Sequence, residues 1–286
     1  MNYIALKLRH AMSEIDTDLC VDALAGAGFE SFETEGNLLT AYIPQPEYER
    51  RRGEIDAVLA GYAPIEERKD ELIPDRDWNA VWESSYEPVR FGNFCFVHAP
   101  FHTPLAEVKY NIEIEPKMSF GTAHHPTTSL MIRFLEEEPP VGKAVLDMGC
   151  GTGVLGILAA MQGAERVLGI DVDEWAYRNA LENVNRNREA IDRNKVVRPQ
   201  VEIKLGDAAL LENMRFDCVL ANINRNILVR DMASYAAVLP VGGTLYLSGF
   251  YEEDMEIVER ACNACRLFYR RHVAHERWTA AKFCKK

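Results

Sequence analysis

Residues 144–160, AVLDMGCGTGVLGILAA, decide the fold. A short apolar run, residues 144–148, is typical of a buried strand, and it leads straight into a turn in which three of five residues are glycine. A second apolar run then begins at Val154 and predicts a helix. Glycines between a strand and a helix permit a tight turn and a close approach of backbone to ligand, and the helix start offers free N–H groups. The stretch therefore predicts a ligand-binding turn at the carboxyl end of a parallel strand.

Strands and helices alternate from this turn to the end of the chain. The predicted strands are 144–148, 166–171, 201–205, 216–221 and 244–248, and the predicted helices are 154–162, 174–187, 227–239 and 252–265, followed by a pair of strands. Such alternation is typical of a doubly wound α/β sheet. Upstream, residues 87–100 and 107–116 are predicted to form two strands.

The first part of the chain has a different order. Strands are predicted at 3–9, 29–34, 37–43 and 63–72, and helices at 13–25 and 46–59. The order β-α-β-β-α-β is the split βαβ, or ferredoxin-like, pattern. We therefore expect a small α+β domain over residues 1–71, a linker helix over 72–86 with Trp78 and Trp82 packing between domains, and the larger domain over 87–286.

Composition restricts the class of protein and its location. The chain has 286 residues, 48% hydrophobic and 27% charged, with seven scattered cysteines. The apolar runs are too short to span a membrane, and MNYIALKLRH has no secretory pattern. A cytoplasmic protein with no membrane partner is expected. The net charge is −12, and residues 1–71 hold 15 acidic and 7 basic residues. This balance argues against direct binding of nucleic acid and suits either a basic partner or a solvated acidic face.

The glycine turn has two interpretations. Gly151, Gly153 and Gly156 match the dinucleotide fingerprint G-x-G-x-x-G, and Asp171 lies 20 residues beyond Gly151, where an acid for ribose hydroxyls is expected. Asp147, however, extends the pattern to D-x-G-x-G-x-G. A carboxylate there would repel a pyrophosphate but could help to hold a cationic ligand. A nicotinamide dehydrogenase, a non-catalytic nucleotide-binding module and a purely structural turn all remain open at this point.

The extended pattern resembles the first motif of S-adenosylmethionine-dependent methyltransferases. That resemblance implies that Asp171 holds the ribose and that Asp207, after the third strand, lies beside the adenine. The fourth strand ends at Asn222, which should face the pocket beyond the carboxyl ends of the strands. Aminomethyltransferases often place an Asn or Asp here, so Asn222 is the candidate catalytic residue, orienting the substrate amine.

A narrower resemblance rests on several motifs. FGTAHHPTT precedes the glycine turn, and WNAVWESSYEPVRFGNFCFVHAP, GIDVDEWA, LANINRNIL and LSGFYEED lie at fitting places around it. Together they resemble the bacterial methyltransferases of large-subunit ribosomal protein 11. The resemblance implies a seven-stranded, Rossmann-like class I methyltransferase domain that binds S-adenosyl-L-methionine. It implies that the substrate is that ribosomal protein, either free or in the ribosome. The implied acceptors are lysine ε-amines, with the N-terminal α-amine as a second acceptor. The cofactor-binding residues it implies are Phe120, Thr122, Thr128, Gly149, Gly151, Asp171, Asp207 and Asn222.

The histidines of FGTAHHPTT suggest a metal site at first sight. His124 and His125 are adjacent, so their side chains would diverge on a regular element, and no H-E-x-x-H pattern lies nearby. We expect no metal, and we expect Pro126 to start a helix. Ala123 stands where the family has glycine, and residues 224–226 are more polar than the family pattern. An enzyme acting on another protein amine or on an RNA base nitrogen is the alternative function.

Overall fold

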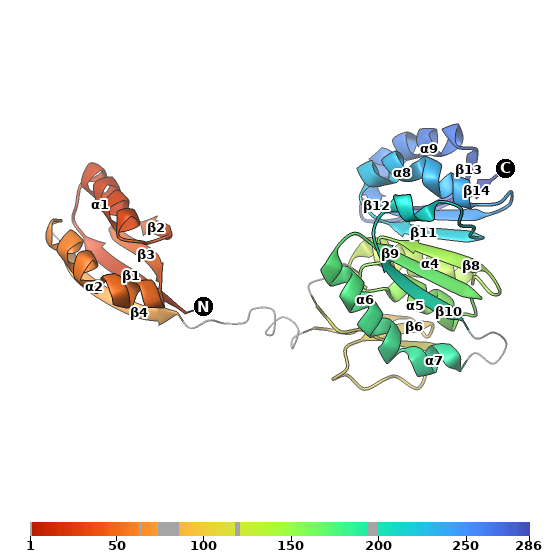
Figure 1. Cartoon of the computed structure of the whole chain (residues 1–286), viewed down its shortest axis with the longest axis horizontal. Helices are drawn as coiled ribbons and strands as arrows, with labels where there is room; N and C mark the ends of the chain where they lie inside the picture. Colours follow the sequence, from red (N-terminus) through yellow and green to blue (C-terminus); the bar gives the residue numbers. More distant parts are fainter. Residues whose placement is uncertain (1, 63–64, 74–85, 118–120, 194–198) are drawn as a thin grey trace. The chain divides into compact units, whose positions relative to one another are not determined.

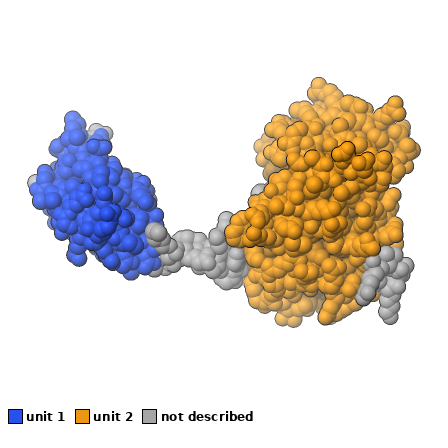
Figure 2. All heavy atoms as spheres, in the orientation of Figure 1, with its two compact units in different colours: residues 1–81 blue, residues 82–286 orange. Residues whose placement is uncertain are grey.

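A computed structural model describes residues 2–62, 65–73, 86–117, 121–193 and 199–286. The chain divides into two compact units, Met1–Val81 and Trp82–Lys286 (Figure 2). The predicted linker helix over 72–86, with Trp78 and Trp82, falls almost wholly outside the described residues. Each unit has its own core, and each is described by itself.

The first unit has the element order expected from the sequence. Its elements are β1 (Tyr3–His10), α1 (Glu14–Gly26), β2 (Ser31–Glu35), β3 (Leu38–Pro44), α2 (Gln45–Ala60) and β4 (Ile65–Ile73). The four strands form an antiparallel sheet in the order β2-β3-β1-β4 (Figure 1). Strand β1 alternates buried Leu6 and Leu8 with more exposed residues, and these leucines join Leu24 of α1 and Ile55 of α2 in one core. Ser13 caps α1, because its side chain accepts from the N–H of Asp16.

The second unit is built on a seven-stranded sheet. Its strand order is β10-β9-β8-β11-β12-β14-β13. The strands are β8 (Ala144–Met148), β9 (Arg166–Asp171), β10 (Gln200–Leu205), β11 (Cys218–Asn222), β12 (Thr244–Tyr251), β13 (Leu267–His275) and β14 (Trp278–Lys285). Strands β8 to β12 run parallel, whereas β14 is antiparallel to both of its neighbours. The carboxyl ends of five strands therefore meet at one edge.

Helices cover both faces of this sheet (Figure 1). The helices are α4 (Pro126–Glu137), α5 (Val154–Met161), α6 (Glu174–Arg186), α7 (Arg188–Asp192), α8 (Arg225–Val238) and α9 (Met255–Ala264), with short 3₁₀ turns η1 (Ala208–Leu211) and η2 (Glu252–Asp254). Val145 packs with residues of α4, α5 and α6, whereas its neighbour Leu146 packs with residues of α8 and α9. Strands buried on both faces explain the continuous apolar runs in the sequence.

Two predicted elements differ from the structure, and one helix, α7, was not predicted. The predicted strand over 87–100 is a hairpin of β5 (Val89–Phe91) and β6 (Cys95–His98), because Gly92 turns the chain at φ +53°. Strand β7 (Tyr110–Glu113) joins β6 in parallel to complete a three-stranded sheet. The predicted helix over 252–265 begins with the separate turn η2, and α7 follows α6 where the sequence analysis expected no further helix. Across the described ranges, no helix is long and apolar enough to cross a membrane.

Candidate active site

The glycine turn has the backbone conformation that its sequence predicts. Gly149, Gly151 and Gly153 have φ values of +69°, +55° and +78°, which glycine adopts without strain. The N–H of Gly149 donates to the carbonyl of Ile170 over 2.8 Å, which ties the turn to the end of β9. A Cβ at Gly149 would lie only 2.1 Å from Cγ2 of Ile223, the residue after Asn222. The turn therefore lies directly against the end of β11, as close as a glycine allows.

Asp171 ends β9 and lies at the turn. Its Oδ2 accepts from the N–H of Gly151 over 2.9 Å, and its Oδ1 accepts from the N–H of Asp173 over 3.0 Å. These two bonds fix the carboxylate, and each oxygen keeps a lone pair for a further donor. The carbonyl of Asp171 accepts from the N–H of Gly206 over 2.8 Å, so Asp207 follows at the same edge of the sheet. Asp207 itself accepts from the N–H of Ala209 and begins η1.

Asp147 is placed differently from the expectation that it helps to hold a cationic ligand. Its side chain is 1% exposed, and its Oδ2 accepts from the N–H of Gly156 over 2.9 Å. The carboxylate therefore joins β8 to the first turn of α5 behind the glycine turn, which is a structural role. Burial raises the pKa of Asp147 to about 7, and the nearby charge of Asp171 adds to the shift.

This pKa predicts a dependence of stability on pH. The Asp147 carboxyl ionises near pH 4 in the unfolded chain and near pH 7 in the folded protein. As pH rises between these values, the unfolded state loses its proton first, so the free energy of unfolding falls, by at most about 4 kcal/mol. Asp147→Asn should remove this fall, which urea unfolding at pH 5 and pH 8 measures. Asp217→Asn is the control: Asp217 is an exposed carboxylate that accepts from the N–H of Ala144. If Asp147→Asn and Asp217→Asn keep the same pH slope, burial does not raise the pKa of Asp147.

The FGTAHHPTT segment lies against the glycine turn. The hydroxyl of Thr152 donates to the carbonyl of Gly121 over 2.7 Å. The carbonyl of the next residue, Thr122, accepts from the hydroxyl of Tyr86 over 2.7 Å. Ala123, which replaces a family glycine, has a φ of +68° and is fully buried. A non-glycine residue in this conformation costs about 1–2 kcal/mol, so the packing around Ala123 maintains it. Phe120 lies outside the described residues.

Helix α4 brings Thr128 to Asn222. Pro126 occupies the first turn of α4, as predicted, and the His125 side chain caps the helix by accepting from the N–H of Thr127. Thr128 is 2% exposed, and its Oγ1 accepts from Nδ2 of Asn222 over 3.3 Å. Two residues that are 94 positions apart in the chain, both expected at the cofactor, are therefore in contact.

The two histidines have aromatic neighbours. His124 packs edge-on against Tyr86 with ring centroids 4.9 Å apart, and His125 packs edge-on against Trp278 at 4.6 Å. The described residues hold no group of three or more potential metal ligands in reach of one ion. The side chains of His124 and His125 are thus occupied in capping and packing.

Gly249 and three asparagines of α6 and its C-cap make close contacts that were not predicted. Gly249 lies in β12 at φ +95°, and a Cβ there would lie 2.2 Å from the carbonyl oxygen of Ile223. Gly249 belongs to the LSGFYEED motif, and a glycine inside a predicted strand is the signal for such a close approach. Asn179, Asn183 and Asn187 recur every fourth residue, a pattern that is visible in the sequence.

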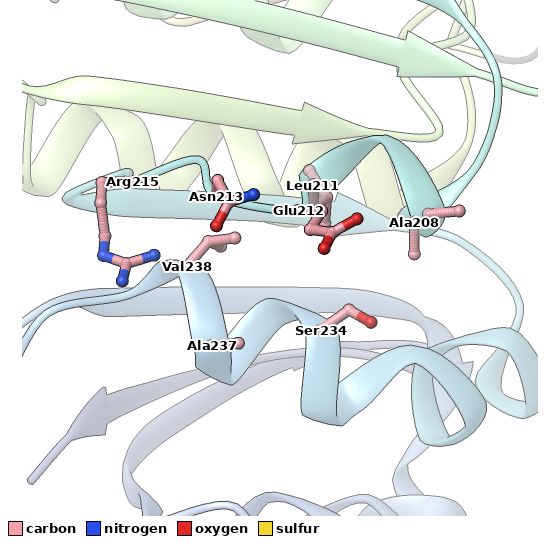
Figure 3. Close-up of a pocket in the computed structure, with 9 residues that line it drawn as sticks. Ala208, Leu211, Glu212, Asn213, Arg215, Ser234, Ala237 and Val238 are labelled. Atoms are coloured by element: carbon pink, nitrogen blue, oxygen red, sulfur yellow. The ribbon is translucent and has the colours of Figure 1, made fainter.

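A separate pocket lies between the segment that follows β10 and helix α8 (Figure 3). Its lining includes Leu211, Glu212, Arg215 and Ser234. None of the predicted site residues lines this pocket. The candidate active site is instead the edge of the sheet where the glycine turn, Asp171 and Asn222 lie.

Comparison with known proteins identifies the family. The family model "Ribosomal protein L11 methyltransferase (PrmA)" matches residues 23–286. The chain belongs to this family. A ribosomal protein L11 methyltransferase of Bacteroides fragilis is 40% identical over 281 residues, covering 96% of each chain, and one of Porphyromonas gingivalis is 39% identical, covering 99% of this chain and 98% of its own. The resemblance read from the motifs is thus confirmed.

The fold has a counterpart among solved structures. The crystal structure of a ribosomal protein L11 methylase from Lactobacillus delbrueckii subsp. bulgaricus matches with a TM-score of 0.61 and 22% identity. The match covers 70% of this chain and 100% of that one. This similarity confirms an α/β methyltransferase-like fold.

Proposed function

We propose that this protein transfers methyl groups from S-adenosylmethionine to amines of ribosomal protein L11. The acceptors are lysine ε-amines, with the N-terminal α-amine as a second acceptor. One observation carries the proposal: the glycine turn with Asp171 and the pair Thr128–Asn222 lie at the carboxyl edge of one parallel sheet, where α/β proteins bind ligands. The membership of the chain in the L11 methyltransferase family supports the substrate.

The residues at this edge fit the cofactor. Gly149 and Gly151 carry no side chains, so a ligand can approach the backbone of the turn closely at these residues. The Asp171 carboxylate suits the two ribose hydroxyls, and Asp207 lies at the next strand end for the adenine. Thr128 contacts the cofactor near Asn222, and Thr122 belongs to the segment beside the turn, whereas Phe120, outside the described residues, stays a predicted contact. When bound, S-adenosylmethionine supplies a methyl group on a positively charged sulfur.

Asn222 orients the acceptor amine in this proposal. Its Nδ2 donates to Thr128, which turns the amide so that Oδ1 is the acceptor for an amine N–H. An amine held in line with the methyl group reacts as if at high effective concentration. Only the neutral amine has a lone pair, and the pKa of a free lysine is about 10.4. Removal of water from the amine at this edge favours the neutral form.

The two units divide the work in this proposal. The antiparallel unit, with its ferredoxin-like order, recognises the ribosomal protein, and the larger, seven-stranded class I unit carries out methyl transfer. The acidic balance of residues 1–71 fits a basic protein partner and not an RNA backbone. The enzyme works in the cytoplasm, where ribosomal proteins are made.

A labelling experiment tests the function. The protein is incubated with methyl-labelled S-adenosylmethionine and purified L11, and the modified residues are located by mass spectrometry. We expect label on lysine side chains of L11, none on ribosomal RNA, and a rise in melting temperature with S-adenosylmethionine but not with NAD. Label on RNA alone, or stabilisation by NAD alone, would contradict the proposal.

Asp171→Ala should weaken S-adenosylmethionine binding about 10–100-fold, because hydrogen bonds to a charged group contribute about 1.5–3 kcal/mol. Calorimetry measures the dissociation constant. Asp173→Ala is the matched control: Asp173 lies two residues on and caps α6 by accepting from the N–H of Trp175. Its loss should cost about 1 kcal/mol of stability and leave the cofactor affinity unchanged. Equal affinities of Asp171→Ala and the wild-type protein would refute the role of Asp171.

A further inference from the structure

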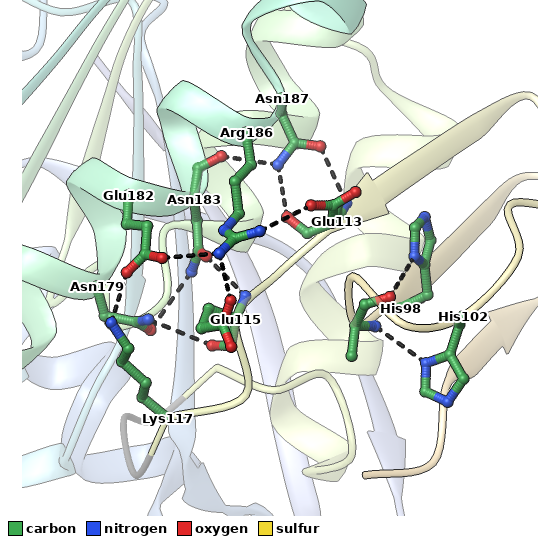
Figure 4. A network of polar contacts seen from close by, with 11 residues as sticks. His98, His102, Glu113, Glu115, Lys117, Asn179, Glu182, Asn183, Arg186 and Asn187 are labelled. Atoms are coloured by element: carbon green, nitrogen blue, oxygen red, sulfur yellow. Dashed lines mark hydrogen bonds and ion pairs between the residues drawn. The ribbon is translucent and has the colours of Figure 1, made fainter. Parts of the chain in front are cut away.

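Helix α6 and its C-cap present three buried amides in a row. Asn179, Asn183 and Asn187 are 1%, 0% and 3% exposed, and a spacing of four puts them on one face of the helix. Buried amides are costly unless they are hydrogen-bonded. Figure 4 shows that all three point at the extended chain that leads out of β7.

The amides bond this chain as a neighbouring strand would. Asn187 accepts from the N–H of Glu113 over 3.0 Å and donates to the carbonyl of Glu113 over 2.6 Å. Asn183 accepts from the N–H of Glu115 over 2.8 Å, and Asn179 donates to the carbonyl of Glu115 over 3.2 Å. Side chains of a helix therefore satisfy the backbone of alternate residues of an extended segment.

Ion pairs also join α6 to the chain that follows β7, in addition to the three buried amides. Arg186 contacts Glu113 at 3.1 Å and Glu115 at 2.5 Å, and Lys117 pairs with Glu182 (Figure 4). These side chains are about one-third exposed, so water and salt screen the pairs. The buried amides are the part of this contact that fixes the backbone.

Asn183 also reaches the glycine turn. Its Nδ2 donates to the carbonyl of Thr152 over 2.9 Å, and the hydroxyl of Thr152 donates to the carbonyl of Gly121 over 2.7 Å. Gly121 has a φ of +97°, and a Cβ there would lie 2.8 Å from Oγ1 of Thr152. The Asn183 amide thus bonds two parts of the chain at once. One is Glu115, upstream of the FGTAHHPTT segment, and the other is Thr152 of the glycine turn.

We infer that Asn183 is a positioning residue of the cofactor site, holding the glycine turn at Thr152 and the chain at Glu115 at a fixed separation. The inference rests on the proposed function, because the turn carries the proposed cofactor residue Gly151, and Thr152 of the same turn bonds Gly121, the neighbour of Thr122. Asn183 is fully buried, so it acts through Thr152 and Glu115 and not by contact. Without the Asn183 amide, the cofactor must order the two segments when it binds. The free energy that this ordering costs lowers the affinity for the cofactor.

Asn183→Ala tests this role, with Asn187→Ala as its matched control. Asn187 has the same side chain and similar burial and also holds the backbone at the end of β7, but its side chain bonds Glu113 and Asn183 and, within the described residues, none of the glycine turn. Both variants should lower the melting temperature to a similar extent. Only Asn183→Ala should raise the dissociation constant and KM for S-adenosylmethionine, about 10-fold, with kcat at saturating cofactor within threefold of wild type. Asn187→Ala should stay within threefold in all three constants.

Thr152→Val provides a second variant if Asn183→Ala fails to fold. Valine keeps the shape of threonine but removes the hydroxyl that donates to Gly121. It should raise the cofactor dissociation constant severalfold. Wild-type affinity in Thr152→Val, or equal affinities in Asn183→Ala and Asn187→Ala, would overturn the inference while the proposed function stands. Absence of S-adenosylmethionine binding in the wild-type protein would instead overturn the proposed function, and the inference with it.

Discussion

Gly249→Ala is expected to destabilise the protein by about 3–5 kcal/mol, near the upper limit for a single substitution. A methyl group at this position would lie 2.2 Å from the carbonyl oxygen and 2.6 Å from the carbonyl carbon of Ile223. These are backbone atoms at the end of β11, so no side chain can rotate to make room. The pairing of β12 with β14 is already irregular between Ser248 and Phe250, which marks Gly249 as the residue of a bulge.

The same substitution should slow methyl transfer in the protein that remains folded. Ile223 follows Asn222, and its N–H donates to the carbonyl of Ser248 over 3.1 Å. A methyl group at Gly249 pushes this part of β11 away and moves the Asn222 amide with it. Misplacement of an orienting group by about 1 Å can cost about 100-fold in rate. We therefore expect kcat on L11 to fall about 100-fold, with a smaller change in the dissociation constant for S-adenosylmethionine.

Gly242→Ala is the control that measures the cost of backbone strain without a steric clash. Gly242 has a φ of +86°, close to that of Gly249, but nothing lies within 4 Å of the Cβ that it would gain. It should cost about 1–2 kcal/mol, the strain of the left-handed conformation alone, with kcat unchanged. Urea unfolding and steady-state kinetics compare the two variants. If they lose the same stability and the same rate, the contact between Gly249 and Ile223 has no special role.

The sequence predicts the glycine turn well because the local chain determines it. A five-residue strand with four apolar residues, glycines that need positive φ and an apolar helix lie within 17 residues, and β8 and β9 have the predicted bounds. The position of β14 between β12 and β13 depends on pairing with distant strands, which the local pattern does not contain. Gly92 shows a missed local signal, since the Gly-Asn pair at 92–93 is typical of the hairpin that forms there.

In the candidate site, too, some residues could be placed from the sequence and others could not. Asp171 follows β9 and meets Gly151 because parallel strand ends share an edge, so its place could be predicted from spacing. The charge of Asp147 suggested that its side chain could help to hold a cationic ligand. The structure shows it 1% exposed behind the turn, because inward-facing residues of a central strand are covered by α5. The contacts of Asn183 with Glu115 and Thr152 join segments 68 and 31 residues away and could not be read from local sequence.

Removal of residues 1–81 should lower kcat/KM for L11 about 1,000-fold and leave the binding of S-adenosylmethionine unchanged. Every described candidate residue for the cofactor lies in the second unit, including Thr128 and Asn222. Each unit has a hydrophobic core of its own, so the second unit is expected to fold without the first. A 1,000-fold loss corresponds to about 4 kcal/mol of docking free energy, a modest value for a protein interface.

The acidic charge of the first unit explains why its removal should lower kcat/KM for L11 so strongly. Lysines are abundant on protein surfaces, so a pocket that receives one side chain cannot select among substrates, and selectivity must come from docking elsewhere. Residues 1–71 carry a net charge of −8, and helix α1 presents the exposed carboxylates of Asp16, Asp18 and Asp22. A basic ribosomal protein would be attracted to this unit, and the attraction should weaken with added salt.

Three measurements decide the docking role. Calorimetry should give equal S-adenosylmethionine affinities for the full chain and the truncated protein, and both should methylate a small free amine equally slowly. Residues 1–81 alone, added in excess, should inhibit methylation of L11 by the full chain, because they compete for the substrate. Loss of cofactor binding on truncation would mean that the first unit supports the fold of the second. Equal rates on L11 would mean that the acidic surface is only solvated and that the second unit recognises its own substrate.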